Sequence, residues 1–186
     1  MMSVIWWVMG ALLLIVLLAG WIGLYNMFIL LKNNVARAWS NIDVLLKQRY
    51  DELPKLVEVC RSYMEYEKET LERVIRLRSV IGGASGLEER LKAEGELAGA
   101  LKTLFAVSEN YPQLKANENF EQLRQRISGL ENEIADRREF YNESANLYNI
   151  KIAQIPDVLV ARMMGCKPIP LFETAPEQRE SSPLNI

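Results

Sequence analysis

Residues 1–31 read MMSVIWWVMGALLLIVLLAGWIGLYNMFILL and contain no Asp, Glu, Lys or Arg. A helix needs about 20 apolar residues to cross the hydrocarbon core of a bilayer, and residues 4–24 alone supply that length. Twelve of these 21 residues are Leu, Ile or Val. Together they favour insertion by roughly 4–7 kcal/mol, and no charged side chain opposes them. We therefore predict an uncleaved transmembrane signal anchor over residues 1–31.

Aromatic side chains flank the apolar core of this anchor. Trp and Tyr are enriched at the two interfaces of a membrane, and Trp6 and Tyr25 stand about 28 Å apart along a helix. We predict that Trp6, Trp7, Trp21 and Tyr25 lie at the membrane interfaces. A cleaved signal peptide is the weaker alternative, because no basic residue precedes the apolar run and Leu18 stands where a small residue is expected before a cut.

The basic residues near the anchor predict its orientation. None precedes it, whereas Lys32, Arg37, Lys47 and Arg49 follow within about 20 residues. The positive-inside rule then places the C-terminal domain in the cytoplasm and the N-terminus outside. We expect a single-pass protein of the inner (cytoplasmic) membrane. Cys60 and Cys166 are far apart and show no spacing typical of a disulfide framework, in agreement with a reducing compartment.

The part after the anchor is strongly charged but nearly neutral. It carries all 22 basic and 24 acidic residues of the chain and is long enough for one domain. This balance argues against binding to nucleic acid, which favours a clustered basic surface. The chain has no histidine, so the commonest general base and the commonest transition-metal ligand are both missing.

The apolar pattern after the anchor is helical. Val35, Trp39, Ile42 and Leu46 are spaced by 4, 3 and 4 residues, which places them on one face of a helix. Pro54 disfavours a helical conformation in the residue before it and suits the first turn of a new helix. We predict that the chain reverses at residues 51–54, although a simple kink is the alternative.

Three further helices are expected. The second helix of the bundle has its apolar stripe at residues 57–74, the third covers residues 87–109, and the fourth and longest covers residues 119–152. The predicted fold class is all-α, with an N-terminal transmembrane helix followed by an antiparallel up-and-down four-helix bundle over residues 32–155. Residues 156–172 are predicted to form an apolar segment near the membrane. Residues 173–186 are rich in Pro, Ser and Glu and are predicted to be disordered.

Many short motifs of the chain resemble those of one known family. They include Tyr25-Asn26, Ala38-Trp39, Ile42-Asp43-Val44, Arg49-Tyr50-Asp51, Tyr111-Pro112, Leu114-Lys115-Ala116-Asn117, Asn119-Phe120, Glu131-Asn132, Arg137, Tyr141-Asn142, Tyr148-Asn149 and Pro156. In this order they are similar to the LemA family of bacterial membrane proteins. The resemblance implies an N-terminal anchor and a cytoplasmic helical bundle. It implies little about activity, and relatives associated with magnetosome membranes suggest membrane organisation. Gln48 and Glu52 depart from the more usual basic and apolar residues.

No catalytic arrangement is evident in the sequence. A nucleophile needs a neighbouring base, and neither cysteine has a histidine available. Glu65, Glu67 and Glu69 are dense enough to suggest a carboxylate metal site, but bundle sites of this kind also use Glu-x-x-His, which is absent. We therefore expect a non-enzymatic protein without a cofactor or a metal.

Two groups of residues are candidates for function. The first is a partner-binding tip at the far end of the bundle, where connecting segments gather; it comprises Asp51, Pro54, Tyr111, Pro112, Lys115, Asn117 and Asn119. The second is a polar bundle core, in which polar side chains usually fix helix pairing and less often bind a ligand; it comprises Asn132, Arg137, Asn142 and Asn149.

These observations favour a non-enzymatic, membrane-anchored scaffold or adaptor in envelope organisation or signalling. Its expected partners are the lipid bilayer and an unidentified protein, with no nucleic acid. The first alternative is a homo-oligomeric structural protein that shapes or marks a membrane. The second alternative is a sensor that binds a small ligand in the polar bundle core near Arg137.

Overall fold

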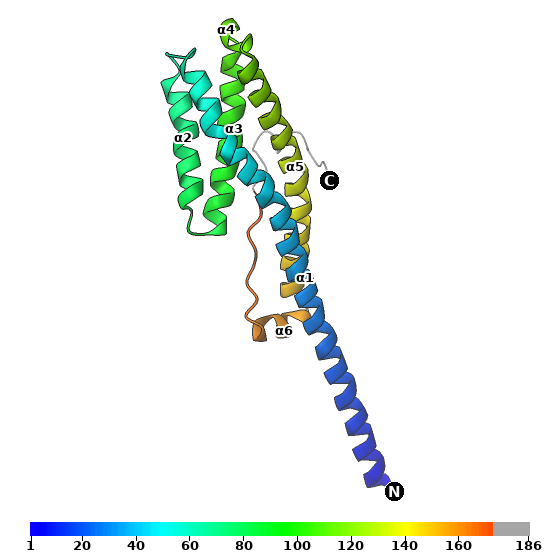
Figure 1. Ribbon diagram of the computed structural model, residues 1–186. Coiled ribbons are helices and arrows are strands. Elements are labelled where there is room, and N and C mark those ends of the chain that lie inside the picture. The colour runs from blue at the N-terminus through cyan, green and yellow to red at the C-terminus, as the bar shows by residue number, and fades with distance from the viewer. Residues whose placement is uncertain (173–186) are drawn as a thin grey trace, which may run out of the picture. The chain divides into compact units, whose positions relative to one another are not determined.

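The computed structural model describes residues 1–172, and their regular secondary structure is entirely helical (Figure 1). The six helices are α1 (Met2–Arg61), α2 (Lys68–Gly83), α3 (Leu87–Ser108), α4 (Pro112–Lys115), α5 (Glu118–Ala153) and α6 (Asp157–Met163). The all-α prediction and the long apolar N-terminal helix are thus confirmed. The tail predicted to be disordered, residues 173–186, lies outside the described residues.

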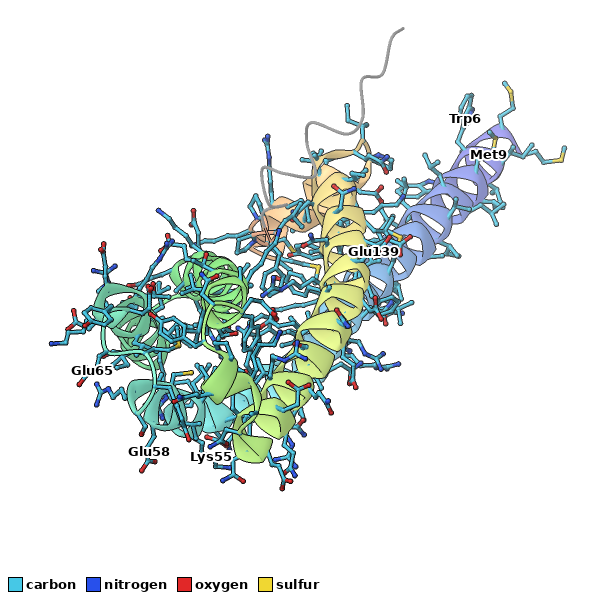
Figure 2. All side chains as sticks on the ribbon, turned by 90° about the horizontal axis from the view of Figure 1, so that it is seen from above. Trp6, Met9, Lys55, Glu58, Glu65 and Glu139 are labelled. Atoms are coloured by element: carbon cyan, nitrogen blue, oxygen red, sulfur yellow. The ribbon has the colours of Figure 1, made fainter. Side chains whose placement is uncertain are left out.

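The described residues divide into two compact units, which share the long helices α1 and α5. Unit 1 contains residues 1–38 and 143–169, and unit 2 contains residues 39–142 and 170–172. In unit 1, none of residues 1–27 is buried, and the first buried side chain along α1 is Phe28. The first part of α1 is long and apolar enough to cross a membrane. Figure 2 shows the side chains of Trp6 and Met9 projecting freely from this part of the helix.

The buried residues of unit 1 come from three helices: Phe28, Leu31, Val35 and Ala38 of α1, Ala145 and Tyr148 of α5, and Val160 and Ala161 of α6. Unit 2 has a larger apolar core. It is formed by Leu53, Leu56, Val57 and Cys60 of α1, Leu71, Val74 and Leu77 of α2, Leu97, Ala100, Leu101 and Leu104 of α3, Leu114 of α4, and Phe120 and Ile127 of α5.

The reversal predicted at residues 51–54 is wrong. Helix α1 continues through Pro54 to Arg61, and the chain turns at residues 62–67 instead. Later residues of α2 then contact earlier residues of α1, so the two helices run in opposite directions. Met64 is buried within the turn and its amide bonds the carbonyl of Cys60.

A neighbouring helix compensates for the proline. Pro54 has no N–H group, so the carbonyl of Tyr50, four residues earlier, lacks its usual partner in the helix. Arg78 of α2 supplies a donor, because its Nε donates a hydrogen bond of 3.3 Å to the Tyr50 carbonyl oxygen. The guanidinium also lies 4.0 Å from the centroid of the Tyr50 ring. A Cβ at Gly82 would lie 3.1 Å from the Tyr50 hydroxyl, so a glycine lets α2 approach closely.

Helix α3 agrees with the sequence pattern. Leu91, Leu97, Leu101 and Leu104 are all buried on α3, as their spacing predicts. The glycine-rich stretch at residues 82–86 ends α2 and supplies its connection, residues 84–86, to α3; the two helices lie side by side in Figure 1. Within this connection, Ser85 donates hydrogen bonds from its amide and its hydroxyl to the Glu89 carboxylate.

Candidate functional site

One end of unit 2, its tip, is formed by the turn at residues 62–67 and the segment at residues 109–119, and side-chain hydrogen bonds connect the two. Asn117 caps α5, because its Oδ1 accepts a 3.0 Å hydrogen bond from the amide of Phe120. Its Nδ2 donates to the hydroxyl of Tyr63 in the other turn, at 3.1 Å. The hydroxyl of Tyr111 donates to Glu67, at 3.3 Å. We call residues 62–67 and 109–119 the tip from here on.

Charged and polar side chains remain available on the tip. Lys115 forms an ion pair with Glu109, and both side chains are about half exposed. Pro112 and Asn119 are also exposed. The tip therefore offers an exposed surface that carries a positive and a negative group.

Asp51 and Pro54 were predicted to lie at this tip, and the structure places them elsewhere. Both are exposed on α1, but the helix continues for ten residues beyond Asp51, about 15 Å. The connection opposite residues 109–119 is therefore the turn at 62–67. Figure 2 shows Glu58 and Glu65 pointing outward beyond Lys55 along this part of the chain.

A buried ion-pair network lies inside unit 2. Arg49 of α1 donates from one terminal nitrogen to Glu94 of α3 and from the other to Glu131 of α5. The side chains of Arg49 and Glu94 are each 1% exposed. Arg90 extends the network, since it contacts Asp43 at 2.6 Å and lies 3.9 Å from Glu94. Three helices are thus joined through one guanidinium.

Burial dominates the electrostatics of this network. It raises the pKa of Glu94 above its ordinary value, although Arg49 and Arg90 oppose the shift. Burial and the neighbouring Arg49 also lower the pKa of Arg138. Nε and Nη2 of Arg138 are buried and have no hydrogen-bond partner within residues 1–172. Two donors of a buried guanidinium therefore remain available to an acceptor.

The predicted polar core is only partly in the interior. Asn132 and Arg137 are exposed, whereas Arg138, the next residue, is partly buried. From Ile127 onward, the buried positions of α5 are Ile127, Leu130, Ile134, Tyr141, Ala145 and Tyr148. Successive members of this set are 3, 4, 7, 4 and 3 residues apart, and Arg138 lies within the seven-residue gap, four residues after Ile134 and three before Tyr141. The spacing of 3, 4 and 4 residues from Ile127 to Arg138 matches the 3.6-residue turn of a straight helix better than a strict heptad does. The core face of α5 therefore includes residue 138 and not residue 137.

Asn142 and Asn149 have a different role from the one predicted. Each amide side chain pairs with the backbone of one residue in the segment after α6. In unit 2, Asn142 donates to the carbonyl of Phe172 at 3.1 Å and accepts from its amide at 2.9 Å. In unit 1, Asn149 makes the same two bonds with Ile169, both at 2.8 Å. These asparagines hold an extended segment rather than a neighbouring helix.

Aromatic rings complete the contact around Phe172. Its ring stacks on Trp39 at a centroid distance of 6.2 Å and meets Tyr141 edge-on at 5.6 Å. Arg138 lies 4.7 Å from the ring centroid. The hydroxyl of Tyr141 donates to the carbonyl of Pro170 at 2.9 Å, and burial raises its pKa to about 12. The Tyr-Asn motif of α5 thus acts through side-chain contacts to the segment that follows.

Arg49, Glu94 and Arg138 are not among the site residues that the sequence predicts. Each one interrupts an apolar stripe at a helical spacing: Arg49 lies between Leu46 and Leu53, and Glu94 lies between Leu91 and Leu97. A charged residue at a stripe position is the signal that could have identified them, because buried charges are paired.

The four predicted membrane-interface residues, Trp6, Trp7, Trp21 and Tyr25, are all exposed in unit 1. Their contact with lipid stays a prediction. Within residues 1–172, no group of three Cys, Asp and Glu side chains is arranged to hold a metal ion.

Comparison with known proteins gives one family match. The LemA family model matches residues 38–185. Magnetosome proteins MamQ 1 and MamQ 2 of Paramagnetospirillum magneticum are each 26% identical over 178 residues, and the alignment covers 82% of this chain and 65% of each relative. Protein LemA of Metamycoplasma hominis is 28% identical over 153 residues, with 80% of this chain and 68% of the relative covered. The chain thus spans just under two thirds of the MamQ proteins.

Proposed function

Because the chain belongs to the LemA family, we propose that it is a non-enzymatic scaffold or adaptor that is anchored in a membrane. The observation that carries this proposal is the character of α1. Residues 2–27 of this helix are apolar apart from Ser3 and Asn26 and have no buried side chain, and the same helix then continues into a folded helical unit. An exposed apolar stretch of this size is stable only in contact with lipid or with another protein.

The proposed membrane is the bacterial inner membrane, crossed once. Four basic residues follow the apolar stretch within about 20 residues, which favours a cytoplasmic location for the helical units. The magnetosome proteins among the relatives support a role at a membrane compartment. A C-terminal reporter that functions only in the cytoplasm tests the orientation, and activity of a periplasmic reporter would contradict it.

The helical units present the tip to partners. We propose that the second part of α1 together with α2, α3 and α5 forms an antiparallel four-helix bundle, since all four helices contribute to one core. The ion pairs of Arg49 with Glu94 and Glu131 fix the pairing of three of these helices. A rigid bundle holds the two turns of the tip in a fixed arrangement, which is the property that a docking surface requires.

Photocrosslinking in living cells tests the tip. A photoreactive residue is placed at Lys115 or at Tyr111, and a matched control replaces Lys92, which is exposed on α3 near the end opposite to the tip. We expect a discrete product with another protein from the two tip positions and not from Lys92. Equal labelling at all three positions would contradict a specific tip. A ladder of self-adducts would favour the membrane-shaping oligomer.

A second candidate function is a sensor for a small anion. The observation that favours it is Arg138, whose two buried donors have no partner within the described chain. Guanidinium groups bind carboxylates and phosphates through such donors. The melting temperature of the full-length protein is measured with and without a dicarboxylate or inorganic phosphate. An increase that is lost in Arg138→Met, but kept in Arg137→Met, would support the sensor.

A further inference from the structure

Helix α6 has apolar side chains on both of its sides. Val160 and Ala161 are buried in unit 1, whereas Leu159 and Met163 are 61% and 74% exposed. Leu159 and Met163 are one helical turn apart and share a face. Ile155, in the turn before the helix, is 87% exposed. A short surface helix in water normally has a polar outer face, so this face needs another explanation.

The position of α6 within unit 1 suggests what covers this face. Figure 1 shows α6 crosswise to α1, beside the part of α1 where the uncovered apolar stretch gives way to the packed part of the unit. If the first stretch of α1 crosses a bilayer, a helix crosswise to it at this level lies along the bilayer surface. The exposed face of α6 is then at the depth of the interface.

The charges around α6 have the sign that lipid headgroups attract. Residues 154–168 contain Arg162 and Lys167, both exposed, and one acidic residue, Asp157. Asp157 is buried and pairs with Lys151 at 3.4 Å, so its charge is neutralised within the protein. The exposed charges of this segment are therefore positive, and the cytoplasmic leaflet is negative.

We propose that α6 is a second membrane contact, in which Ile155, Leu159 and Met163 enter the interface of the bilayer and Arg162 and Lys167 reach its headgroups. This proposal rests on the proposed function, because the anchor delivers α6 to the surface. A helix of seven residues need not bind lipid alone, since an anchor in the same unit gives it a high effective concentration at the membrane.

Site-specific fluorescence in liposomes tests the proposal on the full-length protein. Cysteine replaces one residue at a time in a Cys166→Ser background, and an environment-sensitive dye is attached. Leu159→Cys and Met163→Cys report on α6, Leu14→Cys reports on the anchor, and Glu143→Cys is an exposed control on α5 of the same unit. The liposomes contain zwitterionic and anionic lipids with a nitroxide quencher near the headgroup, and iodide serves as the aqueous quencher.

We expect the nitroxide lipid to quench the dye at Leu159 and Met163 about twofold or more relative to the control at Glu143, as interfacial insertion requires. Quenching by iodide at both α6 positions, with lipid quenching retained at Leu14, would overturn the α6 proposal alone. Protection from both quenchers would indicate an interface between copies and would also overturn it. Absence of lipid quenching at Leu14 would show that the anchor itself is wrong.

Discussion

The two parts of helix α1 have the same secondary structure and opposite chemistry. Residues 2–27 are uncharged, almost entirely apolar on every side, and none is buried, whereas the later part buries one mostly apolar stripe and exposes charged residues between its members. A helix that is apolar all round suits lipid, and a helix with one apolar stripe suits a protein core. One continuous helix thus carries two different apolar patterns along its length, and each part should respond to a different kind of substitution.

The largest expected effect is in the second part. Arg49→Ala leaves the buried Glu94 without its main partner, and breaking a buried pair in this way costs about 3–5 kcal/mol of unfolding free energy. Denaturant unfolding of the full-length protein in detergent, followed by circular dichroism, measures this loss. The matched control Lys115→Ala removes an exposed ion pair and should cost less than about 1 kcal/mol. A similar loss in both variants would contradict the difference between buried and exposed charges.

The double variant Arg49→Met with Glu94→Leu sharpens this prediction. It removes the two fully buried charges and fills their space with apolar atoms, while Glu131, the other partner of Arg49, is 22% exposed and stays in contact with water. Its stability should approach that of the natural chain, because replacing a buried pair by packed apolar groups is often neutral. A double variant as unstable as Arg49→Ala would show that the pair contributes more than mutual neutralisation.

Substitutions in the first part of α1 should change how well the protein inserts into a membrane and should leave the stability of the folded units unchanged. An arginine at the centre of a transmembrane helix costs about 2.5–3.5 kcal/mol, against the roughly 4–7 kcal/mol that the apolar residues contribute. Leu14→Arg should therefore reduce insertion, and Leu14→Arg combined with Leu18→Arg should abolish it. Resistance to carbonate extraction from membranes measures insertion, with Leu14→Ala as the control.

The unfolding midpoint of the folded units should stay unchanged in these anchor variants, because no side chain of residues 1–27 is buried. A large decrease in the midpoint would mean that the apolar stretch packs against the protein.

A smaller effect is expected where α1 passes through its proline. Arg78→Met leaves the Tyr50 carbonyl unsatisfied, which costs about 1–3 kcal/mol. Pro54→Ala provides an N–H group for the same carbonyl within the helix. In the Pro54→Ala background, Arg78→Met should therefore cost measurably less, and a double-mutant cycle of denaturant unfolding gives the coupling. Additive effects would refute the compensation between the two residues.

The smallest effect concerns reactivity rather than stability. Burial raises the pKa of Cys60 in α1 to about 12, and the thiolate is the reactive form. At pH 8, a pKa four units above the pH leaves roughly one thiol in ten thousand ionised. Iodoacetamide should therefore modify Cys166, which is only partly buried, well before Cys60. Denaturant should remove the difference, and equal rates in the folded protein would contradict the burial of Cys60.

The features that the sequence predicted correctly depend on local composition. The apolar first stretch of α1 and the leucine stripe of α3 are each visible within one segment, because apolar spacing alone determines them. The path of α1 through Pro54 depends on Arg78, which lies 24 residues later, and no local pattern contains that information. Proline propensity therefore favoured a reversal that a distant donor makes unnecessary.

In the candidate sites, too, features that depend on neighbouring residues could be predicted, and features that depend on distant residues could not. The cap at Asn117 follows from the residues beside it, whereas its bond to Tyr63 joins two distant turns. A strict heptad through Ile127 and Ile134 places residue 137 in the core, whereas a straight helix places residue 138 there, so an error of one residue exchanges an exposed and a partly buried position. The pairing of Asn142 with Phe172 could not be predicted, because an asparagine on a helix does not indicate which backbone it will bind.

The ion pairs of Arg49 also have a consequence for the order of synthesis. The ribosome makes Arg49 45 residues before Glu94 and 82 residues before Glu131. Until both carboxylates have been translated, a buried Arg49 would carry an uncompensated charge, so the growing chain keeps this side chain in water. The second part of α1 can therefore complete its packing only when α3 and α5 have both emerged in the correct register. Arg49 thus delays burial of its helix until the partners are present, while the first part of α1, made earlier, has no buried side chain that must wait for a later partner.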